Sequence, residues 1–116
     1  MLKLSWSDAR KMLVAGCTVA LGTDCNPGSS LSESLPLMMT LACTQMGLSA
    51  AEAWRGVTRA AAQAVGRADA GHLSVGARGD LVLWDADDHR QVPQHFGVPL
   101  ANTTVVRGVV AYRRAA

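Results

Sequence analysis

The chain has 116 residues, of which 49% are apolar and 17% charged, which predicts one small globular unit rather than a disordered segment. Its net charge is only +2 and aromatic residues make up 4%, so it has neither the basic surface nor the stacking residues typical of nucleic-acid binding. No apolar stretch approaches the roughly 20 residues that a membrane span needs, and the widely spaced Cys17, Cys25 and Cys43 favour buried free thiols in a reducing cytoplasm over a disulfide framework.

The first predicted elements are a helix and an apolar strand. Ser7, placed before DARKMLVAG, predicts a capped short helix that stops at Gly16. Residues 17–22 (CTVALG) form an apolar run without polar alternation, as expected for a strand covered on both faces. Because such a strand needs neighbours to pair its backbone, we expect the chain to be the C-terminal part of a larger α/β fold.

Two helices are expected next. Ser32 or Ser34 can cap a helix that contains LPLMMTLACTQM and ends at Gly47. Ser49 and Glu52 then have the spacing of a capping box, in which each side chain bonds to the backbone of the other residue. The helix that this box opens, AEAWRGVTRAAAQAV, is rich in alanine and is predicted to run without interruption.

From Gly71 the sequence predicts a small β element attached to the α/β body. GHLSVGARGD is rich in turn residues, LVLWD has the composition of a strand, and DADDHRQVPQHFGVPLAN is a long polar connection. TTVVRGVVAYRR predicts two strands joined around Gly108 by a hairpin turn or a bulge.

The loop TDCNPGSS, residues 23–30, contains the candidate site residues. Asp24 directly follows the apolar run, where the end of a barrel strand would suit it to metal binding or proton transfer, although an Asp here can equally cap a turn. Residues 26–28 (Asn-Pro-Gly) are a turn signal that also suits a ligand cradle, because Pro fixes φ and Gly allows close approach. Ser29 and Ser30 offer hydroxyl donors to a ligand or to solvent. From the residues alone, an ordinary turn is favoured.

The runs VALGTDCNPGSS, LPLMMTLACTQMGLSAAEAWRGVTRAAAQAVG and GHLSVGARGDLVLWD closely resemble the C-terminal end of imidazolonepropionases, a family of the metal-dependent amidohydrolase superfamily. The resemblance covers nearly the whole chain, and TDxNPGSS is its specific part. It implies a cytoplasmic enzyme of histidine degradation that hydrolyses the cyclic amide 4-imidazolone-5-propanoate to N-formimidoyl-L-glutamate. It also implies an α/β fold, with residues 1–70 forming the last strand and helices of a (β/α)8 barrel and residues 71–116 the C-terminal portion of a small β-sandwich.

The same resemblance assigns roles to four residues of the loop. Asp24 would bind a divalent metal, Zn or Fe, and would act as the catalytic carboxylate that moves a proton from water to the departing ring nitrogen. Asn26 and Gly28 would contact the formimidoyl-glutamate product, and Ser29 the imidazolone substrate. The partner is thus a small-molecule substrate, with no nucleic acid and no membrane, and a homodimer of the full-length family stays open.

Several expected family residues are absent. The metal-binding HxH pair, a later metal histidine and the substrate-binding Arg and Tyr would all lie upstream of Met1, so we expect the 116 residues alone to be inactive. Ala60 and Gly79 depart from the family pattern and are interpreted as packing variation. Two alternatives stay open: another cyclic-amide hydrolase or deaminase of the superfamily, and a non-catalytic remnant that only associates with another chain.

Overall fold

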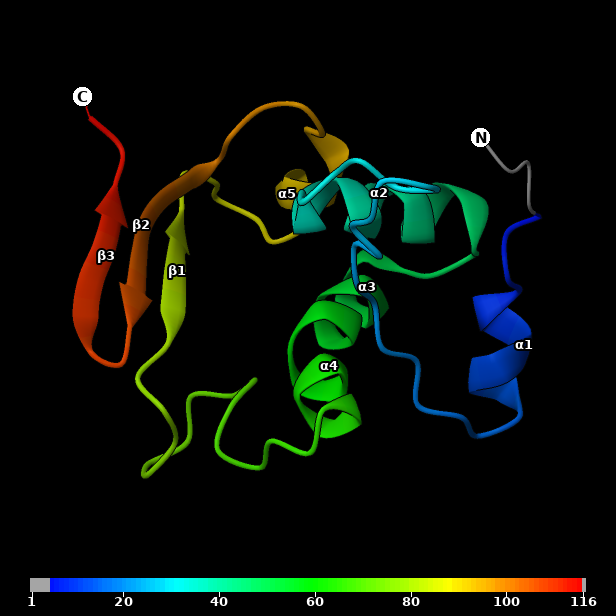
Figure 1. Ribbon diagram of the computed structural model, residues 1–116, viewed down its shortest axis with the longest axis horizontal. Helices are drawn as coiled ribbons and strands as arrows, with labels where there is room; N and C mark the ends of the chain where they lie inside the picture. Colours follow the sequence, from blue (N-terminus) through cyan, green and yellow to red (C-terminus); the bar gives the residue numbers. More distant parts are fainter. Residues whose placement is uncertain (1–4, 116) are drawn as a thin grey trace.

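The computed structural model describes residues 5–115 and contains five helices and three strands within them. In chain order these are α1 (Ala9–Val14), α2 (Leu35–Gln45), α3 (Ala50–Val57), α4 (Arg59–Ala64), β1 (Leu81–Trp84), α5 (Gln91–Gln94), β2 (Ala101–Val106) and β3 (Val109–Arg113). Figure 1 shows the sheet on one side, α2 to α5 in the middle and α1 on the opposite side. The mixed helix-and-strand character expected from the sequence is confirmed. Between residues 5 and 115 no helix has the length and apolar character to cross a membrane.

Local side-chain caps define where the first three helices begin. Asp8, not Ser7, caps α1, because its carboxylate accepts the backbone N–H of the third helical residue at 3.0 Å. Of the two serines proposed for α2, Ser34 is the cap. The capping box before α3 is confirmed: the Ser49 hydroxyl accepts the Glu52 N–H, and the Glu52 carboxylate accepts the Ser49 N–H at 2.8 Å.

The prediction of one continuous helix after Ser49 is wrong, because the helix breaks at Thr58, where φ is −118° and ψ is −96°. The Gly56 carbonyl accepts the backbone N–H of Leu21 at 3.0 Å, whereas in a continuous helix it would accept the N–H of residue 60. The approach is close: a Cβ on Gly56 would lie 2.8 Å from Leu21 Cγ. A distant segment therefore ends α3 and makes glycine necessary there.

That segment, residues 17–22, is not the strand that the sequence predicts. It is not hydrogen-bonded into a sheet, because no strand of the described residues lies beside it to supply partners. Val19 and Leu21 are half-buried, while Thr18 and Ala20 are exposed, so one face is covered rather than both. The covered face packs on a small core of Ala9, Ala42 and Leu48.

The three strands form an antiparallel sheet in the order β1-β2-β3, with β3 at the edge farthest from the helices (Figure 1). The predicted hairpin is confirmed: Arg107 (φ 52°) and Gly108 (φ 79°) form its two-residue turn. Asp80 and Gly79 hold this turn, since Asp80 Oδ1 accepts the Arg107 N–H at 2.7 Å and the Gly79 carbonyl accepts the Gly108 N–H at 2.8 Å. A Cβ at position 79 would lie 3.1 Å from Gly108 N, so a glycine at this position suits the close packing against the turn.

The sheet is joined to the helices through a pair of tryptophans. The rings of Trp54 on α3 and Trp84 on β1 meet edge-to-face, with centroids 5.5 Å apart, and Trp54 Nε1 donates to the His89 carbonyl at 2.8 Å. The connection between β1 and β2, predicted to be long and polar, contains α5. Val92 of this helix is buried, and the carbonyl of Pro93 accepts a hydrogen bond from a threonine hydroxyl of α2.

The cysteines do not form the buried thiols predicted from the sequence. Cys17 and Cys25 are exposed and Cys43 is half-buried, all three as free thiols. The first two lie on the 17–22 segment and the loop that follows it, whose outer faces are bare among the described residues. The burial of Cys43 raises the pKa of its thiol.

Candidate functional site

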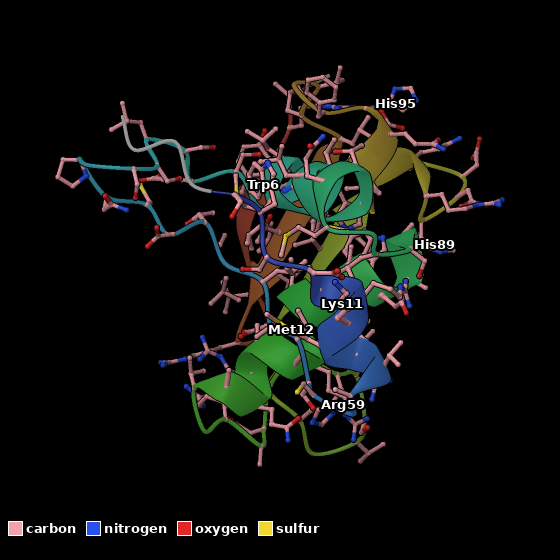
Figure 2. The ribbon with its side chains drawn as sticks, turned by 90° about the vertical axis from the view of Figure 1, so that its right-hand side faces the viewer. Trp6, Lys11, Met12, Arg59, His89 and His95 are labelled. Atoms are coloured by element: carbon pink, nitrogen blue, oxygen red, sulfur yellow. The ribbon has the colours of Figure 1, made fainter. Side chains whose placement is uncertain are left out.

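The candidate site is the loop of residues 23–30, which leaves the 17–22 segment and leads toward α2. Figure 2 shows this part of the chain, light blue to cyan, projecting away from the helices. Its base is closed by two contacts: the Asn26 N–H donates to the Ser30 carbonyl at 2.8 Å, and the Ser30 hydroxyl donates to the Thr23 carbonyl at 2.7 Å. The sequence suggested that the Ser30 hydroxyl would meet a ligand or solvent, but in the structure this hydroxyl helps to close the base of the loop.

Asn26 is the centre of the loop. Its Oδ1 accepts the backbone N–H groups of Gly28 (2.8 Å) and Ser29 (2.9 Å), and its Nδ2 donates to the Asp24 carbonyl and to Ser29 Oγ (2.9 Å). Such a turn is a common use of Asn, whose side chain can replace backbone hydrogen-bond partners two residues ahead. A Cβ on Gly28 would lie 3.2 Å from Asn26 Oδ1, so glycine lets the turn close tightly.

Asp24 lies at the start of the loop in an uncommon conformation. Its φ is +48°, in the left-handed region that costs energy for a residue with a Cβ and that Asp tolerates better than most. The Asn26 amide bonds to its carbonyl, and Ser29 Oγ donates to its Oδ2 at 3.3 Å. Within residues 5–115 its other carboxylate oxygen makes no hydrogen bond, and the residue is exposed. One oxygen is therefore free to meet a ligand.

The loop thus brings together all four residues that the sequence singled out: Asp24, Asn26, Gly28 and Ser29. Their direct hydrogen bonds were not foreseen, although the Asn-x-Gly spacing is the signal from which the central role of Asn26 could have been predicted. No group of three or more His, Cys, Asp or Glu side chains in the described part of the chain could hold a metal ion. Since a catalytic zinc site takes about three protein ligands, the single carboxylate of this loop cannot by itself form a complete site.

The helices behind the loop are tied together by one charged network. Arg10 on α1 donates to both carboxylate oxygens of Glu52 (2.9 and 2.6 Å) and, through Nη2, to the Gly47 carbonyl at 2.8 Å. Hydrogen bonds from Arg10, followed by those from Ser49, lower the pKa of Glu52 from 4.5 to about 2. The network fixes α1 against the start of α3, and these two helices flank the segment that leads into the loop.

Residues 2–111 match the model of the Amidohydrolase family. Among curated proteins, the chain is 46% identical over 108 residues to imidazolonepropionase of Geobacillus sp. (strain WCH70), which is 92% of this chain and 26% of that relative. It is 44% identical over 109 residues to imidazolonepropionase of Myxococcus xanthus (strain DK1622), which is 94% of this chain and 26% of that relative. The chain therefore spans about a quarter of the length of these curated relatives.

Two solved structures have a similar fold. One is a mutant of atrazine chlorohydrolase TrzN from Arthrobacter aurescens TC1 complexed with zinc and atraton, with a TM-score of 0.84 and 26% identity. The other is a triazine hydrolase variant, with a TM-score of 0.83 and 26% identity. Each similarity covers 94% of this chain and 28% of the larger one, so nearly the whole chain has the fold of one part of a larger hydrolase.

Proposed function

Because the chain belongs to the amidohydrolase family, we propose that it forms the C-terminal part of an imidazolonepropionase, which hydrolyses 4-imidazolone-5-propanoate to N-formimidoyl-L-glutamate. The observation that carries this proposal is the 46% and 44% identity to imidazolonepropionases over more than nine tenths of the chain. The identity to the triazine hydrolases is only 26%, which favours the imidazolone ring over a triazine as the substrate.

Asp24 is the proposed catalytic carboxylate. Its exposed oxygen can accept a proton from water and deliver it to the ring nitrogen that departs when the cyclic amide opens. The loop supports this role, since the hydrogen bonds of Asn26 and Ser29 hold the Asp24 backbone and one side-chain oxygen while the other oxygen stays open. A general base must keep its position while its charge changes, and such fixed hydrogen bonds favour that.

Asn26, Gly28 and Ser29 are the proposed substrate-binding residues. Ser29 Oγ lies 3.3 Å from Asp24 Oδ2, so a ring atom that reaches this hydroxyl also reaches the carboxylate. Gly28 leaves the outside of the turn free of a side chain, which suits the formimidoyl-glutamate part of the product. The Asn26 amide can contact a ligand only by exchanging one of its loop hydrogen bonds.

Asp24 is also the proposed metal ligand of this chain. A bound divalent metal, Zn or Fe, supplies a Lewis acid and an activated water. The zinc in the TrzN complex supports a divalent metal in this family. The further ligands would come from the portion of the relatives that this chain does not match, and for that reason we expect the 116 residues alone to be inactive.

We also propose where the chain lies in the complete enzyme. Residues 1–70 would supply the last strand and helices of a (β/α)8 barrel, with the 17–22 segment as that strand, and residues 71–116 the C-terminal portion of a β-sandwich. The exposed outer face of residues 17–22 supports the first assignment, since a barrel strand needs a neighbour on each side. The assignment of residues 71–116 to a β-sandwich is supported by β3, which lies at the edge of the sheet and leaves its outer backbone groups available for another strand.

A chimeric enzyme tests the function. The region of the Geobacillus imidazolonepropionase that matches this chain is replaced by residues 1–116, and conversion of 4-imidazolone-5-propanoate is followed by mass spectrometry. We expect turnover, and we expect Asp24→Asn to reduce kcat by at least about 100-fold, the usual contribution of a general acid–base group. A folded, metal-loaded chimera that leaves this substrate intact while opening another cyclic amide would replace the proposed substrate.

A further inference from the structure

The backbone of Asp24 must be held in place by its surroundings. Its φ of +48° lies in the left-handed region, which costs energy for a residue with a Cβ and persists only where other contacts fix it. The φ and ψ of a residue set how the two peptide groups beside its Cα are turned relative to one another. The contacts that hold the Thr23 and Asp24 carbonyls therefore decide where the Asp24 side chain points.

Each of these two carbonyls accepts a hydrogen bond from a side chain of the loop. The Asn26 amide donates to the Asp24 carbonyl, and the Ser30 hydroxyl donates to the Thr23 carbonyl at 2.7 Å. The hydrogen bond between Ser30 and Thr23 is partly buried, whereas the hydrogen bond from Asn26 is exposed. Because water competes less with a shielded hydrogen bond, Ser30 holds its carbonyl more firmly than Asn26 does.

Ser30 also connects the beginning of the loop to its end. Its carbonyl accepts the Asn26 N–H at 2.8 Å, so this one residue contacts the chain both before and after Asp24. The hydrogen bond to the Asp24 carboxylate comes from the neighbouring Ser29, whose Oγ donates to Oδ2 at 3.3 Å. Ser30 therefore acts on the backbone of Asp24, and Ser29 acts on its side chain.

We propose that Ser30 is a positioning residue of the hydrolytic reaction. Its hydroxyl holds the peptide group between Thr23 and Asp24, and this keeps the Asp24 carboxylate where it can accept and deliver a proton. The hydroxyl does so without touching the substrate, because its proton is donated to the Thr23 carbonyl. A shift of about 1 Å in a catalytic group can lower a rate about 100-fold, so such a hold matters for turnover. The inference rests on the proposed function for the catalytic role of Asp24.

The test uses the chimeric enzyme that contains residues 1–116 within the Geobacillus imidazolonepropionase. Ser30→Ala should lower kcat for 4-imidazolone-5-propanoate about tenfold, the rate equivalent of one lost hydrogen bond. It should leave KM unchanged, because the lost contact is not made to the substrate. Ser30→Thr keeps a hydroxyl and should restore most of the lost kcat. The matched control is Ser32→Ala, which removes a hydroxyl that accepts the Ser34 N–H at 3.2 Å outside the loop and should leave kcat and KM unchanged.

A second background separates positioning from a general structural role. If Ser30 acts through Asp24, Ser30→Ala should have no further effect on kcat once Asp24→Asn has removed the catalytic carboxylate. General damage to the fold would instead lower kcat by the same factor in both backgrounds. The dependence of the Ser30→Ala effect on Asp24 is therefore the result that identifies a positioning residue.

Hydrogen exchange of the chimera, followed by mass spectrometry, adds a readout that needs no substrate. The N–H groups of Asn26, Gly28 and Ser29 are hydrogen-bonded within the loop, so their exchange reports how often the loop opens. Ser30→Ala should raise their exchange rates roughly tenfold, because one hydrogen bond at the base of the loop is lost. Ser32→Ala should leave these rates unchanged.

The proposal is overturned if Ser30→Ala keeps the kcat of the unmutated chimera, if it lowers kcat equally in the Asp24→Asn background, or if exchange of the loop is unchanged. An unmutated chimera that leaves the substrate intact, while Ser30→Ala speeds exchange of the loop, contradicts the proposed function and retains the hold of Ser30 on the loop. Turnover by the Ser30→Ala chimera at the unmutated rate does the reverse.

Discussion

The close contact between Gly56 and Leu21 leads to a prediction whose sign depends on the background. In the wild-type chain, Gly56→Ala would bring a Cβ to 2.8 Å from Leu21 Cγ and 2.9 Å from Leu21 Cδ1, closer than carbon atoms pack. Removal of the Leu21 side chain beyond Cβ by Leu21→Ala removes both contacts. The same Gly56→Ala change then meets the Val19 carbonyl at 3.5 Å, which is ordinary van der Waals contact.

The two opposing terms have similar known sizes. Overpacking a site costs about 1–3 kcal/mol, and Ala in place of Gly within a helix gains up to about 1 kcal/mol. Gly56→Ala should therefore lower the free energy of unfolding by about 1 kcal/mol in the wild-type chain. In the Leu21→Ala chain, Gly56→Ala should raise the free energy of unfolding by up to about 1 kcal/mol. The coupling energy between the two positions should then be about 1–3 kcal/mol.

Urea unfolding of the four proteins, followed by far-UV circular dichroism, measures this cycle. Gly22→Ala is the control, because its Cβ would have no atom within 4 Å and should change the free energy of unfolding by less than about 0.5 kcal/mol. If Gly56→Ala stabilises both backgrounds equally, Leu21 does not pack on α3 in the way that the structure shows. The explanation given for the break at Thr58 would then be refuted as well.

Two further predictions concern the charged network and the hairpin. Because Arg10 lowers the pKa of Glu52 to about 2, the stabilisation from this carboxylate should be fully present above pH 4.5 and lost as the pH falls toward 2. Glu52→Gln should remove that part of the pH dependence, and an unchanged pH profile of thermal unfolding would contradict the network. In the hairpin, Arg107→Asn should raise the free energy of unfolding by up to about 1 kcal/mol, because Asn accepts the φ of +52° more readily and Asn-Gly favours this turn. A urea midpoint equal to that of the wild type would rule this out.

Features set by neighbouring residues followed from the sequence alone. The capping box at Ser49 and the hairpin at Gly108 each depend on residues a few positions apart, and the cap of α2 was narrowed to Ser32 or Ser34 in the same way. The strand LVLWD was predicted from its composition. The four candidate site residues were assigned differently: the residues alone favoured an ordinary turn, and the resemblance of the TDxNPGSS segment to a known family gave them their predicted roles. The helix break at Thr58 could not be predicted from neighbouring residues, because it depends on the contact with Leu21, which lies far away along the chain.

The tertiary structure decided how these local pieces serve the site. It showed that Asp24 has a left-handed conformation and that one of its carboxylate oxygens makes no hydrogen bond within residues 5–115. It also decided that residues 17–22 pack on one face only and that Cys17 and Cys25 are exposed. Sequence patterns predict how strongly a segment favours burial or pairing. Whether such a segment has a partner beside it depends on residues far away along the chain, and only the tertiary structure determines where those residues lie.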